Sequence, residues 1–290
     1  MFRKLFVLTC LASLSLFSSC ASRRTLLRNP KDGMTFVWVP PGSFTAQVAA
    51  EPKTAGDSER TAPQEVAFAQ GFWLGRTEVT VGQFRRFVRL TGRLTDAERA
   101  GSRFTWKNPG FPQGREHPAV YLSYRDAVSY AQWAGVDLPT EAEWLYACRA
   151  GSTTKFYWGD VLDDRCCWNR CNTQGTGSRP VARKRPNAWG LHDMVGNAWE
   201  YCRVGGADFA LRGGSWTRCP QYRTRQGIMA TGLLEEAVSP RLDSGLANSE
   251  FPAYPWDDDR GFRCIYRVVD ASRSSAQPDS RATLSSHQGD

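Results

Sequence analysis

Apolar residues recur at helical spacing in three segments of the chain, residues 80–92, 123–135 and 140–151. Each segment begins with a threonine or serine, carries a Gln, Asp or Glu three residues later, and ends at a glycine about three turns on. This arrangement is typical of a capping box at a helix N-terminus and a glycine stop at the C-terminus. The pattern therefore predicts three amphipathic helices whose apolar stripes belong to the core.

Short apolar segments predict few strands, at residues 35–39, 65–69, 210–213 and 261–266. The rest of the chain is punctuated by 26 glycines and 16 prolines, which favour turns and loops. Helices on scant sheet with long loops indicate an α+β domain and argue against a doubly wound sheet. Residues 45–62 are small and polar, so we expect a mobile loop there.

The N-terminus has the pattern of an export signal. Arg3 and Lys4 precede an apolar run at residues 5–17 that is too short to span a bilayer, and small residues follow up to Cys20. A cysteine at this place resembles the processing site of a bacterial lipoprotein, so Cys20 is the predicted lipidation site; ordinary secretion is the alternative. We expect an exported protein, lipid-anchored in the cell envelope at the outer membrane or cell surface.

The sequence divides into four parts. We expect a signal peptide at residues 1–19, a linker at 20–30, one domain at 31–269 and a disordered tail at 270–290. A content of 41% hydrophobic and 23% charged residues is ordinary for a globular domain.

The formal charge is +8 at pH 7, from 37 basic and 29 acidic residues. No run of basic residues interleaved with aromatic residues predicts a groove for nucleic acid, and we expect no nucleic-acid partner. Two interpretations of the charge remain. It is either a solvated surface with scattered ion pairs or an attraction to an acidic glycan, lipid surface or peptide.

Four short motifs follow one another between residues 138 and 264. They are Leu-Pro-Thr-Glu-Ala-Glu-Trp at 138–144, Gly-Leu-His-Asp-Met-Val-Gly-Asn-Ala-Trp-Glu at 190–200, Arg-Gly-Gly-Ser-Trp at 212–216 and Gly-Phe-Arg-Cys at 261–264. Their order resembles the formylglycine-generating enzyme, or sulfatase-modifying factor, superfamily, and the resemblance covers residues 30–269. It implies a single C-type-lectin-like α+β domain with long ordered loops. It leaves function open, because the superfamily hosts oxidising enzymes and binding proteins without chemistry.

Asp193 and Glu200 lie seven residues apart around a turn that contains Gly196. Calcium prefers hard oxygen ligands, which the carboxylates and main-chain carbonyls of a tight loop supply together. The resemblance implies a calcium site formed by the side chains of Asp193 and Glu200 and the carbonyls of Gly196 and Ala198. The alternative is that both carboxylates cap turns and that Asn197 holds a left-handed bend.

Seven cysteines remain when Cys10 of the predicted signal and the lipidation site Cys20 are set aside, an odd number in a compartment that permits disulfides. The resemblance implies a disulfide between Cys148 and Cys264. Cys166, Cys167 and Cys171 lie close together in sequence and indicate a local disulfide or a metal site. A zinc site would need a further ligand at the right spacing, which the sequence lacks.

The sulfatase-oxidising relatives carry a cysteine pair shortly after Gly-Gly-Ser, and that pair binds copper(I), which soft thiolates select. Here the two positions hold Arg218 and Arg223, and Cys219 stands one residue late. Cys202 is a distant stand-in for the second thiolate. Cys219 and Ser215 are the catalytic candidates if the chain is an oxidase, although Ser215 lacks an adjacent histidine to activate it.

The first functional hypothesis is a non-catalytic module that uses residues 216–259 to bind a protein or peptide in the envelope or extracellular space. Proteins that retroelements diversify place their variable residues in this same window. The segment is rich in residue types found at binding hot spots. These residues are Trp216, Tyr222, Arg223, Arg225, Tyr254 and Trp256.

Two alternatives stay open. An oxidase of the formylglycine-generating type would convert a cysteine of a substrate peptide to formylglycine, with copper as cofactor and Cys219 as nucleophile or ligand. An accessory factor would bind an envelope protein without altering it. The missing second cysteine favours binding over catalysis.

Overall fold

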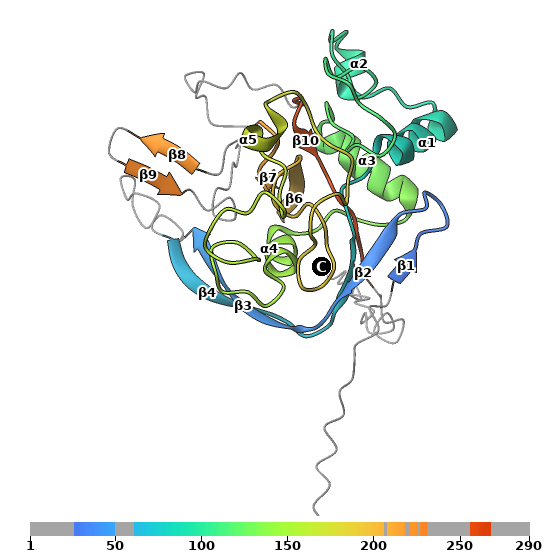
Figure 1. Cartoon of the computed structure of the whole chain (residues 1–290). Helices are drawn as coiled ribbons and strands as arrows, with labels where there is room; N and C mark the ends of the chain where they lie inside the picture. The colour runs from blue at the N-terminus through green and yellow to red at the C-terminus, as the bar shows by residue number, and fades with distance from the viewer. Residues whose placement is uncertain are drawn as a thin grey trace, which may run out of the picture.

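The computed structural model describes residues 26–49, 61–205, 208–217, 221–224, 227–230 and 256–267. The helices of this part are α1 (Val81–Thr91), α2 (Asp96–Arg99), α3 (Tyr124–Ala134), α4 (Glu141–Arg149) and α5 (Arg170–Thr173). Its strands are β1 (Leu26–Arg28), β2 (Thr35–Val39), β3 (Gly42–Ala49), β4 (Thr61–Phe68), β5 (Phe72–Gly75), β6 (Trp199–Gly205), β7 (Asp208–Arg212), β8 (Gln221–Thr224), β9 (Gly227–Ala230), β10 (Arg260–Gly261) and β11 (Ile265–Tyr266). The mixture of helices and strands agrees with the predicted α+β class (Figure 1).

The predicted signal peptide, the lipidation site Cys20 and the tail at 270–290 lie outside the described residues. Among the residues that are described, no helix has both the length and the apolar character needed to cross a membrane.

The three predicted helices are confirmed, and each begins with a complete capping box. Thr80, Ser123 and Thr140 are the N-caps of α1, α3 and α4, and each side chain accepts a hydrogen bond from the backbone N–H three residues on. α1 and α3 end at the predicted glycines in left-handed conformation. α4 ends one residue early, because Ala150, with φ of 48°, takes the left-handed position ahead of Gly151.

A four-stranded antiparallel sheet in the order β1-β2-β5-β11 frames the domain. Next to it, β3 and β4 form a long hairpin that curves around α4 (Figure 1). A second sheet has the order β10-β6-β7, with β10 parallel to β6 and β7 antiparallel to it. The first sheet thus carries the N-terminal strand β1 and the C-terminal strand β11 on its two edges.

The four-stranded sheet separates two hydrophobic clusters. Phe36 of β2 and Cys264, just before β11, pack with residues of α1 and α3. Their sequence neighbours Val37 and Ile265 pack with residues of α4. Because successive side chains of a strand point to opposite faces, this alternation gives each face of the sheet its own core.

The predicted strands are confirmed in place but not always in length. Residues 35–39 form β2 as predicted, and the strand expected at 65–69 belongs to the longer β4. The strand expected at 261–266 is divided into β10 and β11. The division follows from Arg263, which lies between them and points into the interior to pair with Glu200.

The mobile loop expected at residues 45–62 is wrong at both ends. The strands β3 and β4 occupy its first and last residues and pair with each other in antiparallel register. The residues between the two strands lie outside the described part of the chain. The sequence misled because this segment lacks the apolar alternation that marks a half-buried strand, while cross-strand pairing depends on a partner distant in sequence.

Candidate functional site

The Gly-Gly-Ser-Trp motif follows β7 and closes the base of the segment predicted to bind a partner. Gly213 has φ of 97°, and a side chain there would meet the Trp144 ring at 3.2 Å, so the turn requires glycine. Ser215 Oγ donates to Asp259 Oδ2 at 2.6 Å, and Thr217 Oγ1 donates to the same oxygen at 2.6 Å. Asp259 therefore ties the start of this segment to its end.

Ser215 is not arranged as an activated nucleophile. Its side chain is 1% exposed, and its hydroxyl is held by Asp259. The two described histidines bond elsewhere: His117 Nδ1 contacts Ser178 Oγ at 3.4 Å, and His192 Nδ1 donates to the Lys184 carbonyl at 2.9 Å. Ser215 therefore has no histidine to activate it, and its hydroxyl is occupied in a buried structural hydrogen bond.

Trp216, predicted as a contact residue of the binding segment, is buried instead. Its ring lies edge-on to Phe111 with centroids 5.3 Å apart. The backbone N–H of Trp216 donates to the Asn197 carbonyl at 3.1 Å, and the backbone carbonyl of Trp216 accepts from Thr173 Oγ1 at 3.2 Å. Trp216 thus anchors the base of the segment, because a large aromatic side chain gains more by packing in the core than by exposure.

The remaining contact residues are described only in part. Tyr222 and Arg223 lie on β8, which pairs with β9 in an antiparallel hairpin at the periphery of the domain (Figure 1). Trp256 is half-buried just before the chain returns to Asp259. The predicted residues outside the described part are Arg225, Tyr254 and the catalytic candidate Cys219.

Glu200, a predicted calcium ligand, is already engaged by protein groups. Arg263 Nε donates to Glu200 Oε2 and Arg263 Nη2 donates to Oε1, both at 2.6 Å. The Trp144 indole N–H donates to Oε2 at 2.6 Å. Both members of the ion pair are at most 1% exposed. Both carboxylate oxygens of Glu200 therefore have protein partners.

Two neighbouring carboxylates each keep one free oxygen. Asp193 Oδ2 accepts from the Ala182 N–H at 2.6 Å, and Glu78 Oε1 accepts from Asn197 Nδ2 at 3.0 Å. Asp193 Oδ1 and Glu78 Oε2 are buried and have no hydrogen-bond partner in the described structure. Burial, with repulsion from Glu200 as a smaller cause, raises the pKa of Asp193 to about 6 and the pKa of Glu78 well above its usual range.

The loop that carries Asp193 is tightly wound. Asn197 has φ of 64°, the left-handed bend that belongs to the alternative to a calcium site. Gly196 has φ of 83°, and a side chain at this position would lie 2.1 Å from the Trp168 carbonyl oxygen. Within the described residues, no hydrogen bond is donated to the carbonyls of Gly196 or Ala198.

These groups fit a hard cation. The buried carboxylates of Glu78, Asp193 and Glu200 all interact with the guanidinium of Arg263. Negative charge is therefore in excess among these four groups when all are ionised. The oxygens without partners come from Asp193 and Glu78, and oxygen is the ligand that calcium prefers. Glu78 was not among the predicted ligands. Its neighbours Thr77 and Val79 differ in polarity, so no local pattern marks Glu78 as a buried residue.

The disulfide predicted between Cys148 and Cys264 is absent, and both residues are buried free thiols. Cys148 packs in the α4 cluster, whereas Cys264 packs with α1 and α3. The reason is the alternation along β11: Ile265 faces α4, so Cys264 faces the other side of the sheet. Burial raises the pKa of both thiols.

Cys202, the possible stand-in for a second copper ligand, lies on β6 in the core. Burial raises the pKa of its thiol well above the usual value. A copper(I) site that acts on a peptide needs thiolates within reach of the substrate. The described residues do not fit such a site. Cys166 and Cys167 are also buried free thiols, whereas Cys171 is disulfide-bonded.

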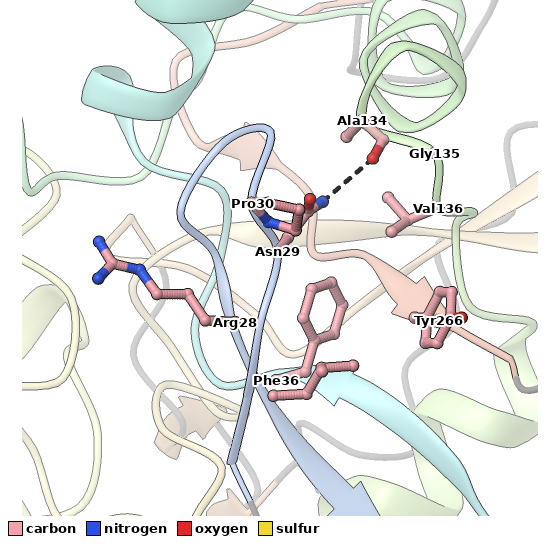
Figure 2. Close-up of a pocket in the computed structure, with 9 residues that line it drawn as sticks. Arg28, Asn29, Pro30, Phe36, Ala134, Gly135, Val136 and Tyr266 are labelled. Atoms are coloured by element: carbon pink, nitrogen blue, oxygen red, sulfur yellow. Dashed lines mark hydrogen bonds between the residues drawn. The ribbon is translucent and has the colours of Figure 1, made fainter.

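A cavity of about 220 Å³ lies apart from all of these groups, between β1 and the C-terminal end of α3 (Figure 2). Leu27, Phe36 and Val136 contribute apolar walls. At its edge, Asn29 Nδ2 donates to the Ala134 carbonyl at 3.1 Å. None of the residues predicted to act in binding, catalysis or metal coordination lines this cavity.

The chain belongs to the sulfatase-modifying factor family, since residues 22–268 match the sulfatase-modifying factor enzyme 1-like domain. The formylglycine-generating enzyme of Streptomyces coelicolor is 34% identical over 86% of this chain and 94% of the relative. A Bos taurus relative named inactive C-alpha-formylglycine-generating enzyme 2 is 29% identical over 63% of this chain and 76% of the relative. The predicted family is confirmed.

The solved structure of PvdO from Pseudomonas aeruginosa has the same fold. It superimposes with a TM-score of 0.61 at 22% identity, covering 83% of this chain and 97% of that structure. The predicted fold class, a single α+β domain of C-type-lectin-like type, is confirmed.

Proposed function

We propose that this family member is a non-catalytic binding module that displays the segment between Thr217 and Asp259. The observation that carries the proposal is the closure of its base, where the Ser215 and Thr217 hydroxyls meet Asp259 Oδ2. Trp216 adds a buried anchor beside them. A segment held at both ends by a rigid scaffold offers contacts at a low cost in conformational entropy. Its partner is a protein or peptide of the envelope or extracellular space.

The chemistry of the site supports the absence of catalysis. The positions of the oxidising cysteine pair hold Arg218 and Arg223. Cys202 is buried in the core, out of reach of a peptide. A second family member, the Bos taurus relative, carries the word inactive in its name.

An activity assay tests the first half of the proposal. The purified protein is incubated with copper, dioxygen, a thiol reductant and a Cys-x-Pro-x-Arg peptide, with the Streptomyces coelicolor relative as positive control. We expect the relative to convert the peptide cysteine to formylglycine and this protein to leave the peptide mass unchanged. Conversion by this protein, abolished in Cys219→Ser, would establish an oxidase and overturn the proposal.

A peptide-display selection tests the second half. A random peptide library is selected on the immobilised protein, and the enriched peptides are measured again on Tyr222→Ala and on Leu90→Ala, a control at an exposed position of α1. We expect binding to fall at least about tenfold with Tyr222→Ala, the loss of one hot-spot contact, and to be unchanged with Leu90→Ala. Enriched peptides that bind Tyr222→Ala as tightly as the parent protein would contradict the proposal.

We also propose that calcium binds beside this base, held by Asp193, the carbonyls of Gly196 and Ala198, and Glu78. Calcium would neutralise the excess buried charge and supply no redox chemistry. At about 100 times its Kd, calcium should add about 2.7 kcal/mol to the free energy of unfolding. The measurement is the melting temperature with calcium and with EDTA. Asp193→Asn should abolish the difference and Asp160→Asn, on an exposed loop, should keep it; equal melting temperatures for the parent protein exclude the site.

Export and anchoring at Cys20 complete the proposed function. The support is the N-terminal sequence pattern and the position of β1, where the chain enters the domain six residues after Cys20. In bacterial cells fed a labelled fatty acid, we expect label in the parent protein and none in Cys20→Ala. Label in both, or in neither, would contradict the anchor.

A further inference from the structure

Cys171 differs from the other described cysteines because it is disulfide-bonded. The free thiols of the described structure are Cys148, Cys166, Cys167, Cys202 and Cys264. The nine cysteines of the chain include three more, Cys10, Cys20 and Cys219. The partner of Cys171 is therefore one of these three.

The proposed export signal gives the two N-terminal cysteines other roles. Cys10 lies in the apolar run of the signal pattern, and Cys20 is the lipidation site of that pattern. The chain reaches the domain at β1, on a different side from α5, the helix that carries Cys171 (Figure 1). Cys219 is the partner that remains.

A contact of α5 falls three residues before Cys219 in the sequence. Thr173, at the end of α5, donates through Oγ1 to the Trp216 carbonyl at 3.2 Å. Cys219 follows Trp216 by three residues, a stretch that spans at most about 10 Å. A disulfide needs Cα atoms about 4.4–6.8 Å apart, which this tether permits.

We infer that Cys171 and Cys219 form a disulfide that fastens the start of the displayed segment to α5. Its formation joins the two sulfur atoms and removes two protons and two electrons, which reduce a disulfide oxidant of the export compartment to a dithiol. The bond adds a covalent link between the displayed segment and α5 to the hydrogen bonds of Ser215 and Thr217 with Asp259. The bond would also occupy the Cys219 thiol, which is the catalytic candidate of an oxidase. The inference does not depend on the binding proposal.

Peptide mapping of the full chain tests this inference directly. The protein is purified from an oxidising compartment, blocked with N-ethylmaleimide under denaturing conditions and digested with trypsin without reductant. Cleavage after Arg165, Arg170 and Arg218 places the relevant cysteines in three separate peptides, 166–170, 171–183 and 219–223. We expect peptides 171–183 and 219–223 to be joined, and peptide 166–170 to carry two maleimides. A maleimide on Cys219, or a link from Cys171 to another peptide, overturns the inference.

Two variants separate the bond from general misfolding. Cys171→Ser should leave Cys219 as a new maleimide-reactive thiol, whereas Cys166→Ser should keep the linked peptides. If Cys171→Ser does not fold, the mapping of the parent protein decides alone. A linked pair together with a converted peptide in the oxidase assay would refute the binding proposal and leave the disulfide standing, so the two failures are distinguishable.

Discussion

Arg263 illustrates how much a single buried residue holds together. It pairs with both oxygens of Glu200 and donates to the carbonyls of Gly75 and His192 at 3.0 Å. The guanidinium thus connects β5, the Asp193 loop and β6 from one position. A buried charge of this kind is tolerated because each of the three guanidinium nitrogens donates to a protein oxygen.

Arg263→Leu should lower the free energy of unfolding by about 3–5 kcal/mol, because Glu200 would be left as an unpaired buried charge. The double variant with Glu200→Gln should lose less than the sum of the single variants. Equilibrium urea denaturation measures both. The control is Arg203→Leu, which breaks a solvent-exposed pair with Asp137 and should cost under about 1 kcal/mol. Equal losses for Arg263→Leu and Arg203→Leu would contradict the prediction.

Asp258 gives the domain a dependence on pH. It stands between Asp257 and Asp259, and burial together with these neighbours raises its pKa from 3.8 to about 7. The folded state keeps a proton that the unfolded chain releases, so stability falls as pH rises from about 4 to about 7.

Asp258→Asn should remove this loss, because the amide cannot ionise. Its melting temperature should exceed that of the parent protein at about pH 8 and approach it at about pH 4. The measurement is a series of melting curves across this range, with Asp160→Asn as the control that keeps the parent slope. A parent-like slope in Asp258→Asn would show that another group titrates.

At the scale of elements, the helix ends are set by local sequence. The capping boxes at Thr80, Ser123 and Thr140 form as the sequence predicts, because their partners are three residues away. α4 is the exception at its C-terminus, where Ala150 adopts the left-handed conformation that glycine adopts in α1 and α3. A residue with a Cβ atom is strained in this conformation.

Ala150→Gly should therefore stabilise the domain by about 0.5–1 kcal/mol, since glycine accepts a positive φ at little cost. Ala131→Gly, inside α3, is the matched comparison and should destabilise by about 1 kcal/mol or more. Urea denaturation of both variants measures the sign of each change in the free energy of unfolding. If Ala150→Gly is as harmful as Ala131→Gly, packing of the Ala150 methyl group outweighs the strain.

At the scale of the whole molecule, one sheet supports both cores. β2 and β5 carry side chains into the α1 and α3 cluster on one face and into the α4 cluster on the other. Neither cluster can stay buried when these strands separate. We therefore expect the two cores to unfold together.

Two buried thiols report on the two faces. Cys264 lies in the α1 and α3 cluster and Cys148 in the α4 cluster, and both are free. In a urea series with maleimide labelling and peptide mapping, the two thiols should become reactive at the same midpoint, because burial protects both until the sheet opens. Midpoints that differ would show that one core unfolds before the other.

The sequence by itself determined the features that depend on neighbours along the chain. The three helix N-caps and the strand at 35–39 follow from side chains within a few residues, so the local pattern is sufficient. The ordered motifs likewise determined the family and the fold class.

Only the tertiary structure decided which residues meet across the fold. Cys264 and Cys148 lie on opposite faces of the sheet, and Trp216 is buried against Phe111. Glu78 interacts with Asp193, although more than a hundred residues separate them in the sequence. Each outcome depends on which face of an element a residue occupies and on what packs there. A sheet that carries a different core on each face makes that assignment a property of the assembled molecule, because one step along a strand moves a side chain from one core to the other.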